Sequence, residues 1–159
     1  MHLLNEFTLT AEKSKSLWVL GDLYTFHITG EQTGGAFAII EASVQPGSTP
    51  PPHIHHFEDE AFYVLDGHFS FTRGKQQIEG NAGHFIHIPK GTAPTFTNVG
   101  KTKGKLLTML SPAGLEKFFF EIGSEATGSL RPEDPSVIEK VIDLAMAYRM
   151  EILMHQPTN

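Results

Sequence analysis

Two histidines and a glutamate are spaced so that they can act together on a metal ion. His53 and His55 are separated by one residue, and Glu60 follows after a short polar stretch. Alternate residues of a strand point to the same face, so both imidazoles can enter one cavity. Residues 56–59 can turn the chain and return Glu60 to it. Two imidazoles and one carboxylate suit a divalent first-row metal, as in non-haem iron oxygenases. The alternative is a pair of surface histidines beside an acidic turn.

The elements around these residues are predicted to be short strands. Between residues 17 and 110, apolar stretches rich in β-branched and aromatic residues alternate with turn residues. This pattern predicts an antiparallel sandwich or barrel. Two helices are predicted after the strands, the first with Ser111 as N-cap and the second opened by Asp134-Pro135. Residues 150–153 form either a final strand or a frayed end. We therefore expect an N-terminal arm (1–16), a barrel (17–112) and a C-terminal helical extension (113–159).

Two ordered motifs in this region resemble those of the cupin superfamily. The first, G-x5-H-x-H-x3,4-E-x6-G, is matched at every fixed position, and the second, G-x5-P-x-G-x2-H-x3-N, at all but one. The matching residues are Gly47, His53, His55, Glu60 and Gly67 in the first motif, and Gly83, Pro89, Gly91 and Asn98 in the second. The resemblance implies a mainly β fold, the double-stranded β-helix or jelly-roll barrel, with two short C-terminal helices. More loosely, the chain is similar to small single-domain proteins related to quercetin dioxygenases.

The position that departs from the second motif is Pro94, where cupin metalloenzymes usually supply a fourth ligand, a histidine. Proline cannot bind a metal. Three interpretations follow. His53, His55 and Glu60 hold the metal alone, or His87 on the preceding strand fills the gap, or the metal site is degraded and a metal-free pocket remains.

The resemblance implies a metal-dependent enzyme with dioxygenase-type chemistry on a small aromatic or enol-bearing molecule. The cofactor would be one divalent transition metal, Fe, Mn, Ni, Co or Zn. Glu60 would be the third ligand or a catalytic base that takes a substrate proton. Strand alternation places Phe62 on the face of Glu60, and Phe96 on the face of Pro94 and Asn98, so these four residues are predicted to line the pocket. Alternatively, the rings only fill the barrel.

Two rival functions come from other classes. One is a non-catalytic protein that binds a small molecule in a cupin cavity with a degraded metal site, which Pro94 favours. The other is a metal-independent sugar isomerase or epimerase. Such a site needs basic groups in the cavity, and the arginines fall in a turn, a linker and the C-terminal tail, so the sequence gives it little support.

The composition indicates which classes of binding partner, and which cellular location, to expect. The 159 residues carry a net charge of −6, which disfavours nucleic acid. The chain has no cysteine, no apolar run long enough for a bilayer and no basic, apolar leader, so we expect a cytoplasmic protein that does not bind membranes. The family resemblance favours a homodimer, with the N-terminal segment and Phe118–Phe120 as candidate contacts.

Overall fold

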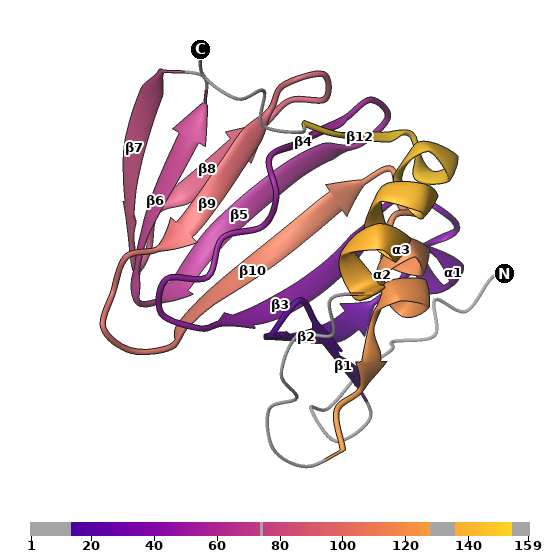
Figure 1. Ribbon diagram of the computed structural model, residues 1–159, viewed down its shortest axis with the longest axis horizontal. Coiled ribbons are helices and arrows are strands. Elements are labelled where there is room, and N and C mark those ends of the chain that lie inside the picture. The colour runs from indigo at the N-terminus through magenta and orange to yellow at the C-terminus, as the bar shows by residue number, and fades with distance from the viewer. Residues whose placement is uncertain (1–13, 74, 128–135, 154–159) are drawn as a thin grey trace, which may run out of the picture.

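The computed structural model describes residues 14–73, 75–127 and 136–153 (Figure 1). Residues 1–13 of the predicted arm lie outside this part, and so do Asp134 and Pro135, the residues predicted to begin the second helix. Within it, no helix has both the length and the apolarity needed to cross a bilayer.

The strands form a barrel of antiparallel sheets, which confirms the predicted mainly β fold. The large sheet has seven strands in the order β11 (Ser124–Glu125), β1 (Lys15–Val19), β2 (Asp22–Ile28), β3 (Ala38–Val44), β10 (Gly104–Ser111), β5 (Asp59–Asp66) and β8 (Phe85–Ile88). A second sheet has the order β7 (Gln76–Asn81), β6 (His68–Arg73) and β9 (Pro94–Asn98). The third pairs β12 (Met150–Ile152) with β4 (His53–His55).

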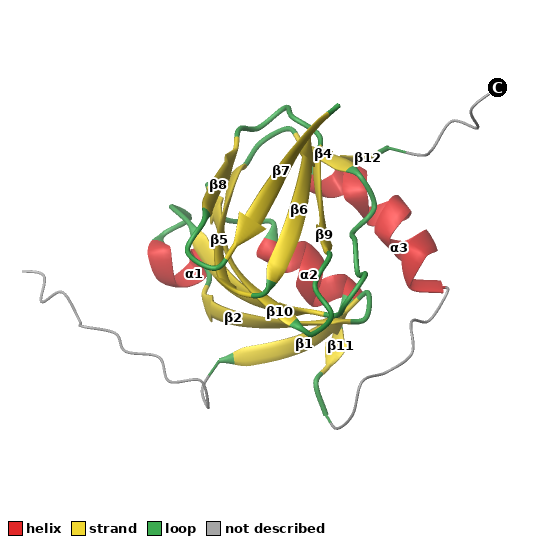
Figure 2. Ribbon diagram, turned by 90° about the vertical axis from the view of Figure 1, so that its left-hand side faces the viewer, coloured by secondary structure: helices red, strands yellow, loops and turns green. Residues whose placement is uncertain are grey.

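Three short helices accompany the strands: α1 (Gly30–Thr33), α2 (Glu116–Ile122) and α3 (Ser136–Ala145), the last followed by a 3-10 turn at Met146–Tyr148. Figure 2 shows α2 and α3 together on one side of the barrel. The prediction that Ser111 caps the first C-terminal helix is wrong. Ser111 is the last residue of β10, where its hydroxyl donates to the Ala36 carbonyl at 3.1 Å, and the helix begins at Glu116.

The core has two parts that meet inside the barrel. Between the large sheet and the three-stranded sheet, the rings of Phe62, Phe69, Phe71 and Phe96 pack with centroids 5.4 to 6.3 Å apart. The second part lies between the large sheet and the C-terminal extension and includes Leu17, Phe26, Leu115, Phe118, Val141 and Met150. The extension therefore closes one end of the barrel with apolar side chains (Figure 1).

Strand β4, which carries both histidines, is held by the C-terminal end of the described chain. Met150 of β12 lies opposite His55, and Ile152 lies opposite His53. On the other side of the strand, the Gly91 amide donates to the His55 carbonyl at 2.7 Å. Residues 150–152 therefore form a strand, which decides between the two alternatives left open for this segment.

Gly67, the last glycine of the first motif, makes the turn from β5 to β6 possible. Its φ of 92° lies in the left-handed region, where side chains other than that of glycine are strained. A Cβ atom at this position would also lie 2.8 Å from the Cα of Gly104. The motif glycine is thus required by backbone geometry at the end of the strand that bears Glu60.

Candidate functional site

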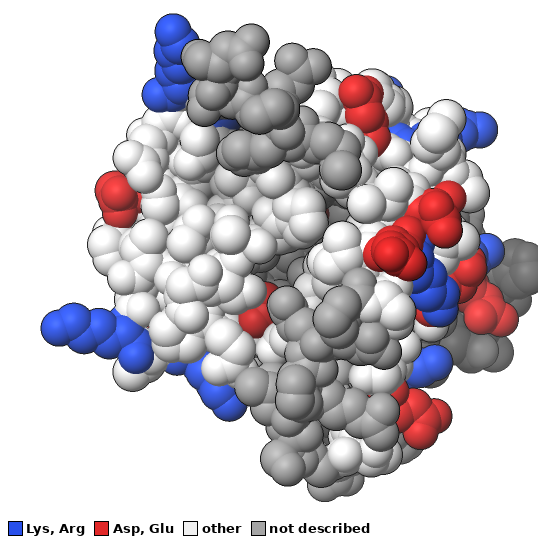
Figure 3. All heavy atoms as spheres, in the orientation of Figure 1, with Lys and Arg blue, Asp and Glu red and all other residues white. Residues whose placement is uncertain are grey.

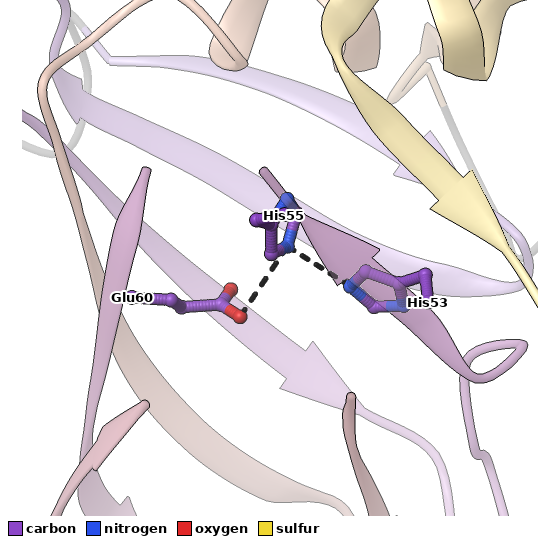
Figure 4. A group of neighbouring side chains, drawn as sticks. All are labelled: His53, His55 and Glu60. Carbon is purple, nitrogen blue, oxygen red and sulfur yellow. Dashed lines mark hydrogen bonds and ion pairs between the residues drawn. The ribbon is translucent and has the colours of Figure 1, made fainter. Parts of the chain in front are cut away.

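His53, His55 and Glu60 converge on one point inside the barrel (Figure 4). The Nε2 atoms of the two histidines are 3.0 Å apart, and Nε2 of His55 is 3.5 Å from Oε2 of Glu60. His55 and Glu60 are buried, and His53 is half-buried. Strand β4 presents both imidazoles on one face because they are two residues apart, and β5 supplies the carboxylate from the facing wall.

The hydrogen bond on the far side of the His53 ring fixes its proton. Nδ1 of His53 lies 2.8 Å from the Pro51 carbonyl oxygen, which can only accept, so Nδ1 carries the hydrogen. Burial and the neighbouring His55 lower the pKa of His53, which keeps this ring neutral. Its Nε2 therefore offers a lone pair to the cluster, the form in which histidine binds metals.

The pKa of His55 is shifted in the opposite direction to that of His53, mainly because of Glu60. Burial alone would lower the pKa of His55, but the hydrogen bond and charge of Glu60, together with the charge of Glu58, outweigh it, and the pKa is raised. In the absence of a metal, Nε2–H of His55 donates to the lone pair of His53 Nε2. A cation at this point would replace that proton, because a ligating nitrogen must be bare.

The three residues fit a divalent transition metal. Two atoms bound at about 2.0–2.1 Å with angles of about 90–109° lie roughly 2.9–3.4 Å from each other. The separations of 3.0 and 3.5 Å are close to this range, and all three donor atoms lie within 4.8 Å of one another. Two neutral imidazoles and a carboxylate suit Fe, Mn, Ni, Co or Zn without distinguishing among them.

Glu58 is a buried neighbour that the sequence analysis missed. Its side chain is only 4% exposed, and its Oε2 lies 4.0 Å from Nδ1 of His55. Burial raises the pKa of Glu58 against the opposing charges of His55 and Arg149. The i, i+2 spacing of Glu58 and Glu60 is the signal that both point inward.

The other predicted site residues are placed as follows. His87 lies on β8 with its side chain exposed, while Ile86 and Ile88 take the inner face, so strand alternation keeps His87 out of the cluster. The interpretation in which His87 completes the ligand set is therefore wrong. Pro94 begins β9, opposite Arg73 of β6, and its side chain lies outside the described part of the structure.

Asn98 is buried but serves the turn that follows its strand, so the prediction that it lines the pocket is corrected. Its Nδ2 donates to the carbonyls of Val44 at 2.9 Å and Thr102 at 3.0 Å, and its Oδ1 accepts from the Gly100 amide at 2.9 Å. These bonds tie Asn98 to the end of β3 and to the loop after β9, and Asn98 is not among the described residues that line the cavity.

The cluster forms one polar wall of an otherwise apolar cavity of about 70 Å³. Phe62 and Phe96 line it, as do Tyr24, Thr95 and Thr108. The C-terminal extension closes it with Phe118, Phe119, Ile122, Val141, Met150 and Ile152. No lysine or arginine is among the described lining residues, which disfavours a site for sugar phosphates. On the face drawn in Figure 3, lysine and arginine side chains are scattered around the edge.

Tyr24 places a phenol in this cavity. Burial, with the charges of Asp22 and Glu60, raises its pKa well above the ordinary value for tyrosine, so the hydroxyl stays protonated and can donate a hydrogen bond. Its inward direction follows from strand periodicity: Tyr24 is two residues from Asp22 and two from Phe26, so it shares their face of β2, and both of them are buried.

Comparisons with known proteins agree with this geometry. The family described as "Cupin domain" matches residues 40–110, which include β4, β5 and the cluster. The quercetin 2,3-dioxygenase of Bacillus subtilis (strain 168) is 27% identical over 108 residues, covering 68% of this chain and 32% of the relative. The Aspergillus japonicus quercetin 2,3-dioxygenase is 26% identical over 121 residues, 72% of this chain and 34% of the relative. The matches thus span about a third of these two curated relatives.

Solved structures share the fold. A predicted oxalate decarboxylase from Thermotoga maritima superposes with a TM-score of 0.61 at 18% identity, covering 67% of this chain and 99% of that one. At this identity the likeness concerns the fold alone.

Proposed function

Because this chain belongs to the cupin superfamily and is similar to quercetin dioxygenases, we propose that it is a metal-dependent enzyme with dioxygenase-type chemistry. Its substrate is a small aromatic or enol-bearing molecule. When bound, the metal supplies a positive charge that favours the ionised form of a coordinated substrate hydroxyl, and redox chemistry if it is iron or manganese. The family and the curated relatives support the class of reaction, and the site supports the kind of substrate.

The observation that carries the proposal is the meeting of His53 Nε2, His55 Nε2 and Glu60 Oε2 in the wall of a largely apolar cavity. Two neutral nitrogens and one carboxylate would leave open metal positions for a substrate oxygen. The hydrocarbon part of the molecule would then contact Phe62 and Phe96, which exclude water. A volume of about 70 Å³ favours small enols over flavonols, because pockets for drug-sized ligands measure roughly 300 Å³ or more.

Each polar residue has a distinct part in this proposal. His53 and His55 hold the metal, and the bond from His53 Nδ1–H to the Pro51 carbonyl keeps the ring oriented. Glu60 is either the third ligand or the base that receives the substrate hydroxyl proton on Oε2. Tyr24 stays protonated and donates to a substrate oxygen. The apolar side chains of the C-terminal extension keep bulk water away from the reacting atoms.

The experiment is metal analysis of tag-free protein by plasma mass spectrometry, beside a His53→Ala/His55→Ala double variant. We expect near-stoichiometric metal in the wild-type protein and background metal in the variant. Oxygen uptake is then measured with small enols and flavonols. His87→Ala is the matched control, because this histidine is exposed and outside the cluster. Background metal in the wild type after reconstitution would overturn the proposal.

A non-catalytic small-molecule-binding protein is the second candidate, and Pro94 is the observation that favours it. At that position the second cupin motif has a ligand, and among the described residues no fourth histidine or carboxylate joins the three. This candidate predicts stabilisation by small aromatic molecules in metal-free protein, with no oxygen uptake at any metal loading. Thermal-shift screening with and without added metal separates the two functions.

We propose, as for many small cupins, a homodimer. In the predicted contact at Phe118–Phe120, Phe118 is buried, and the half-buried Phe119 and Phe120 pack against Phe26 at 6.4 and 4.6 Å. The neighbouring exposed rings of Tyr63 and Phe85, on the edge of the large sheet, support a contact there instead. Light scattering that shows only a 17.6 kDa species would contradict the dimer.

A further inference from the structure

Two buried polar atoms beside the cluster lack a hydrogen-bond partner, and they face each other. Nδ1 of His55 and Oε2 of Glu58 are both shielded from solvent, and their separation of 4.0 Å is too long for a hydrogen bond. Leaving a buried donor or acceptor without a partner costs stability. Such a pair is therefore unexpected in a segment whose only task is structural.

The ring of His55 connects this pair to the metal centre. Its Nε2 belongs to the cluster, so a metal there requires Nε2 to be bare and leaves the ring proton on Nδ1. The acceptor that Nδ1 then faces is Oε2 of Glu58. His53 already has the equivalent bond, from its Nδ1 to the Pro51 carbonyl. Among the described residues, His55 is thus the candidate ligand whose Nδ1, the ring nitrogen that faces away from the cluster, has no hydrogen-bond partner.

Glu58 is turned away from water. The side chain of Phe57, stacked under the Arg149 guanidinium at 4.5 Å, lies next to it in the chain, and Glu58 is 4% exposed. The carboxylate beside it in sequence, Asp59, is already engaged, since its Oδ1 accepts from the Lys90 amide at 2.9 Å. Glu58 therefore differs from Asp59 in burial, direction and partner.

We propose that Glu58 is a positioning residue that accepts the Nδ1 proton of His55 in a hydrogen bond when Nε2 binds the metal, and so holds the ring in its ligating tautomer and orientation. This inference rests on the proposed metal-dependent function and adds a residue outside the three ligands. The separation of 4.0 Å exceeds a hydrogen bond by about 1 Å, so the proposed bond requires a shift of that size when metal binds. Carboxylate–histidine–metal arrangements of this kind commonly change metal affinity by about 10- to 100-fold.

The test is the affinity of purified, metal-free protein for Co²⁺, measured by competition with a chromophoric chelator. We expect the dissociation constant of Glu58→Leu, which has no acceptor for the His55 Nδ1 proton, to rise about 10- to 100-fold over wild type. Asp59→Asn is the matched control, because it removes the same charge from the adjacent residue and keeps an oxygen for the Lys90 amide. Its dissociation constant should equal that of the wild type.

Thermal unfolding of the metal-free variants separates positioning from a structural role. Glu58→Leu replaces a buried carboxylate whose Oε2 has no hydrogen-bond partner with an apolar side chain, so its melting temperature without metal should equal or exceed that of the wild type. A lower melting temperature together with unchanged Co²⁺ affinity would assign Glu58 to the fold and overturn the inference. Co²⁺ binding by Glu58→Leu with wild-type affinity would do the same. Wild-type protein that does not bind Co²⁺ would instead overturn the proposed function itself.

A measurement on the wild-type protein does not depend on the variant folding. In the Zn²⁺-loaded protein, nitrogen-15 NMR of the histidine rings should show a His55 Nδ1–H protected from exchange with solvent. A His55 Nδ1–H that exchanges freely would overturn the inference while leaving metal binding intact.

Discussion

Glu116 and Glu58 are both buried carboxylates, and their surroundings are opposite. Glu116, at the start of α2, accepts from the Gly30 amide at 2.7 Å and the Gly114 amide at 2.6 Å, so each oxygen has a backbone donor. Oε2 of Glu58 has no hydrogen-bond partner. Glu116 ties the first residue of α1 to the loop before α2. A buried carboxylate that holds the fold is satisfied by the fold, whereas one left unsatisfied beside converging imidazoles is available for a ligand or a proton.

Glu116→Ala should have the largest effect on stability. The substitution leaves two buried amides, those of Gly30 and Gly114, without an acceptor, and we expect a loss of about 2–4 kcal/mol in the free energy of unfolding. Chemical denaturation measures it. Co²⁺ affinity of the folded fraction should not change. A loss well under 1 kcal/mol would show that the paired carboxylate is not a structural anchor, and the comparison with Glu58 would fail.

Asn98→Ala should have the next largest effect, a loss of about 2 kcal/mol in the free energy of unfolding. The carbonyl of Val44 at the end of β3 and the Thr102 carbonyl and Gly100 amide after β9 all lose their partner. Substrate and metal affinities should stay at their wild-type values, since the side chain does not face the cavity. A reduced metal affinity with an unchanged free energy of unfolding would show instead that Asn98 lines the pocket, as its strand position predicted.

Glu60→Gln should leave the unfolding free energy of metal-free protein within about 1 kcal/mol of wild type. Glu60 contacts His55 only at 3.5 Å, and the amide removes a buried charge without changing the shape of the side chain. The Co²⁺ titration sharpens its role. Weaker binding identifies a ligand, while wild-type binding with loss of oxygen uptake identifies a base. A destabilisation as large as that of Glu116→Ala would contradict the contrast between the two regions.

Tyr148→Phe should have the smallest effect, because the acceptor of its hydroxyl, Glu121, is exposed. That bond raises the pKa of Tyr148 from 10.0 to about 12. A pKa raised by folding stabilises the protein fully below pH 10, and this contribution disappears as the pH rises through about 12. We expect a difference below about 1 kcal/mol from the variant, shrinking over that interval. Ultraviolet titration of tyrosinate would contradict this if Tyr148 ionises near pH 10.

The residues whose roles depend on local spacing were predictable from the sequence. His53 and His55 share a face because they are two residues apart in a strand, and Gly67 is needed where the chain adopts a positive φ. Glu60 follows from its offset in the first motif. Phe62 and Phe96 are inward by strand alternation, and both line the cavity. These inferences require only the periodicity of a strand and the geometry of a turn.

The directions of His87, Glu58 and Asn98 depend on burial and on contacts between distant segments, and could not be predicted from local spacing. Alternation alone left the direction of His87 open, and the packing of Ile86 and Ile88 against the inner rings turned it outward. Glu58 looks like an exposed residue of an acidic turn until the chain covers it. The side chain of Asn98 bonds to two nearby loop residues and to Val44, which lies 54 residues away in the sequence and comes near it only in the folded chain.

The sequence by itself determined the class of fold and the three candidate ligands, because local periodicity and motif spacing specify strands, turns and the face that each side chain takes. Only the tertiary structure decided what surrounds those ligands. Strand β12 comes about a hundred residues after β4 in the sequence, yet its backbone holds the strand of His53 and His55, and the extension that carries it closes the cavity. Packing between segments so far apart sets the burial of Glu58, and no local pattern encodes that environment.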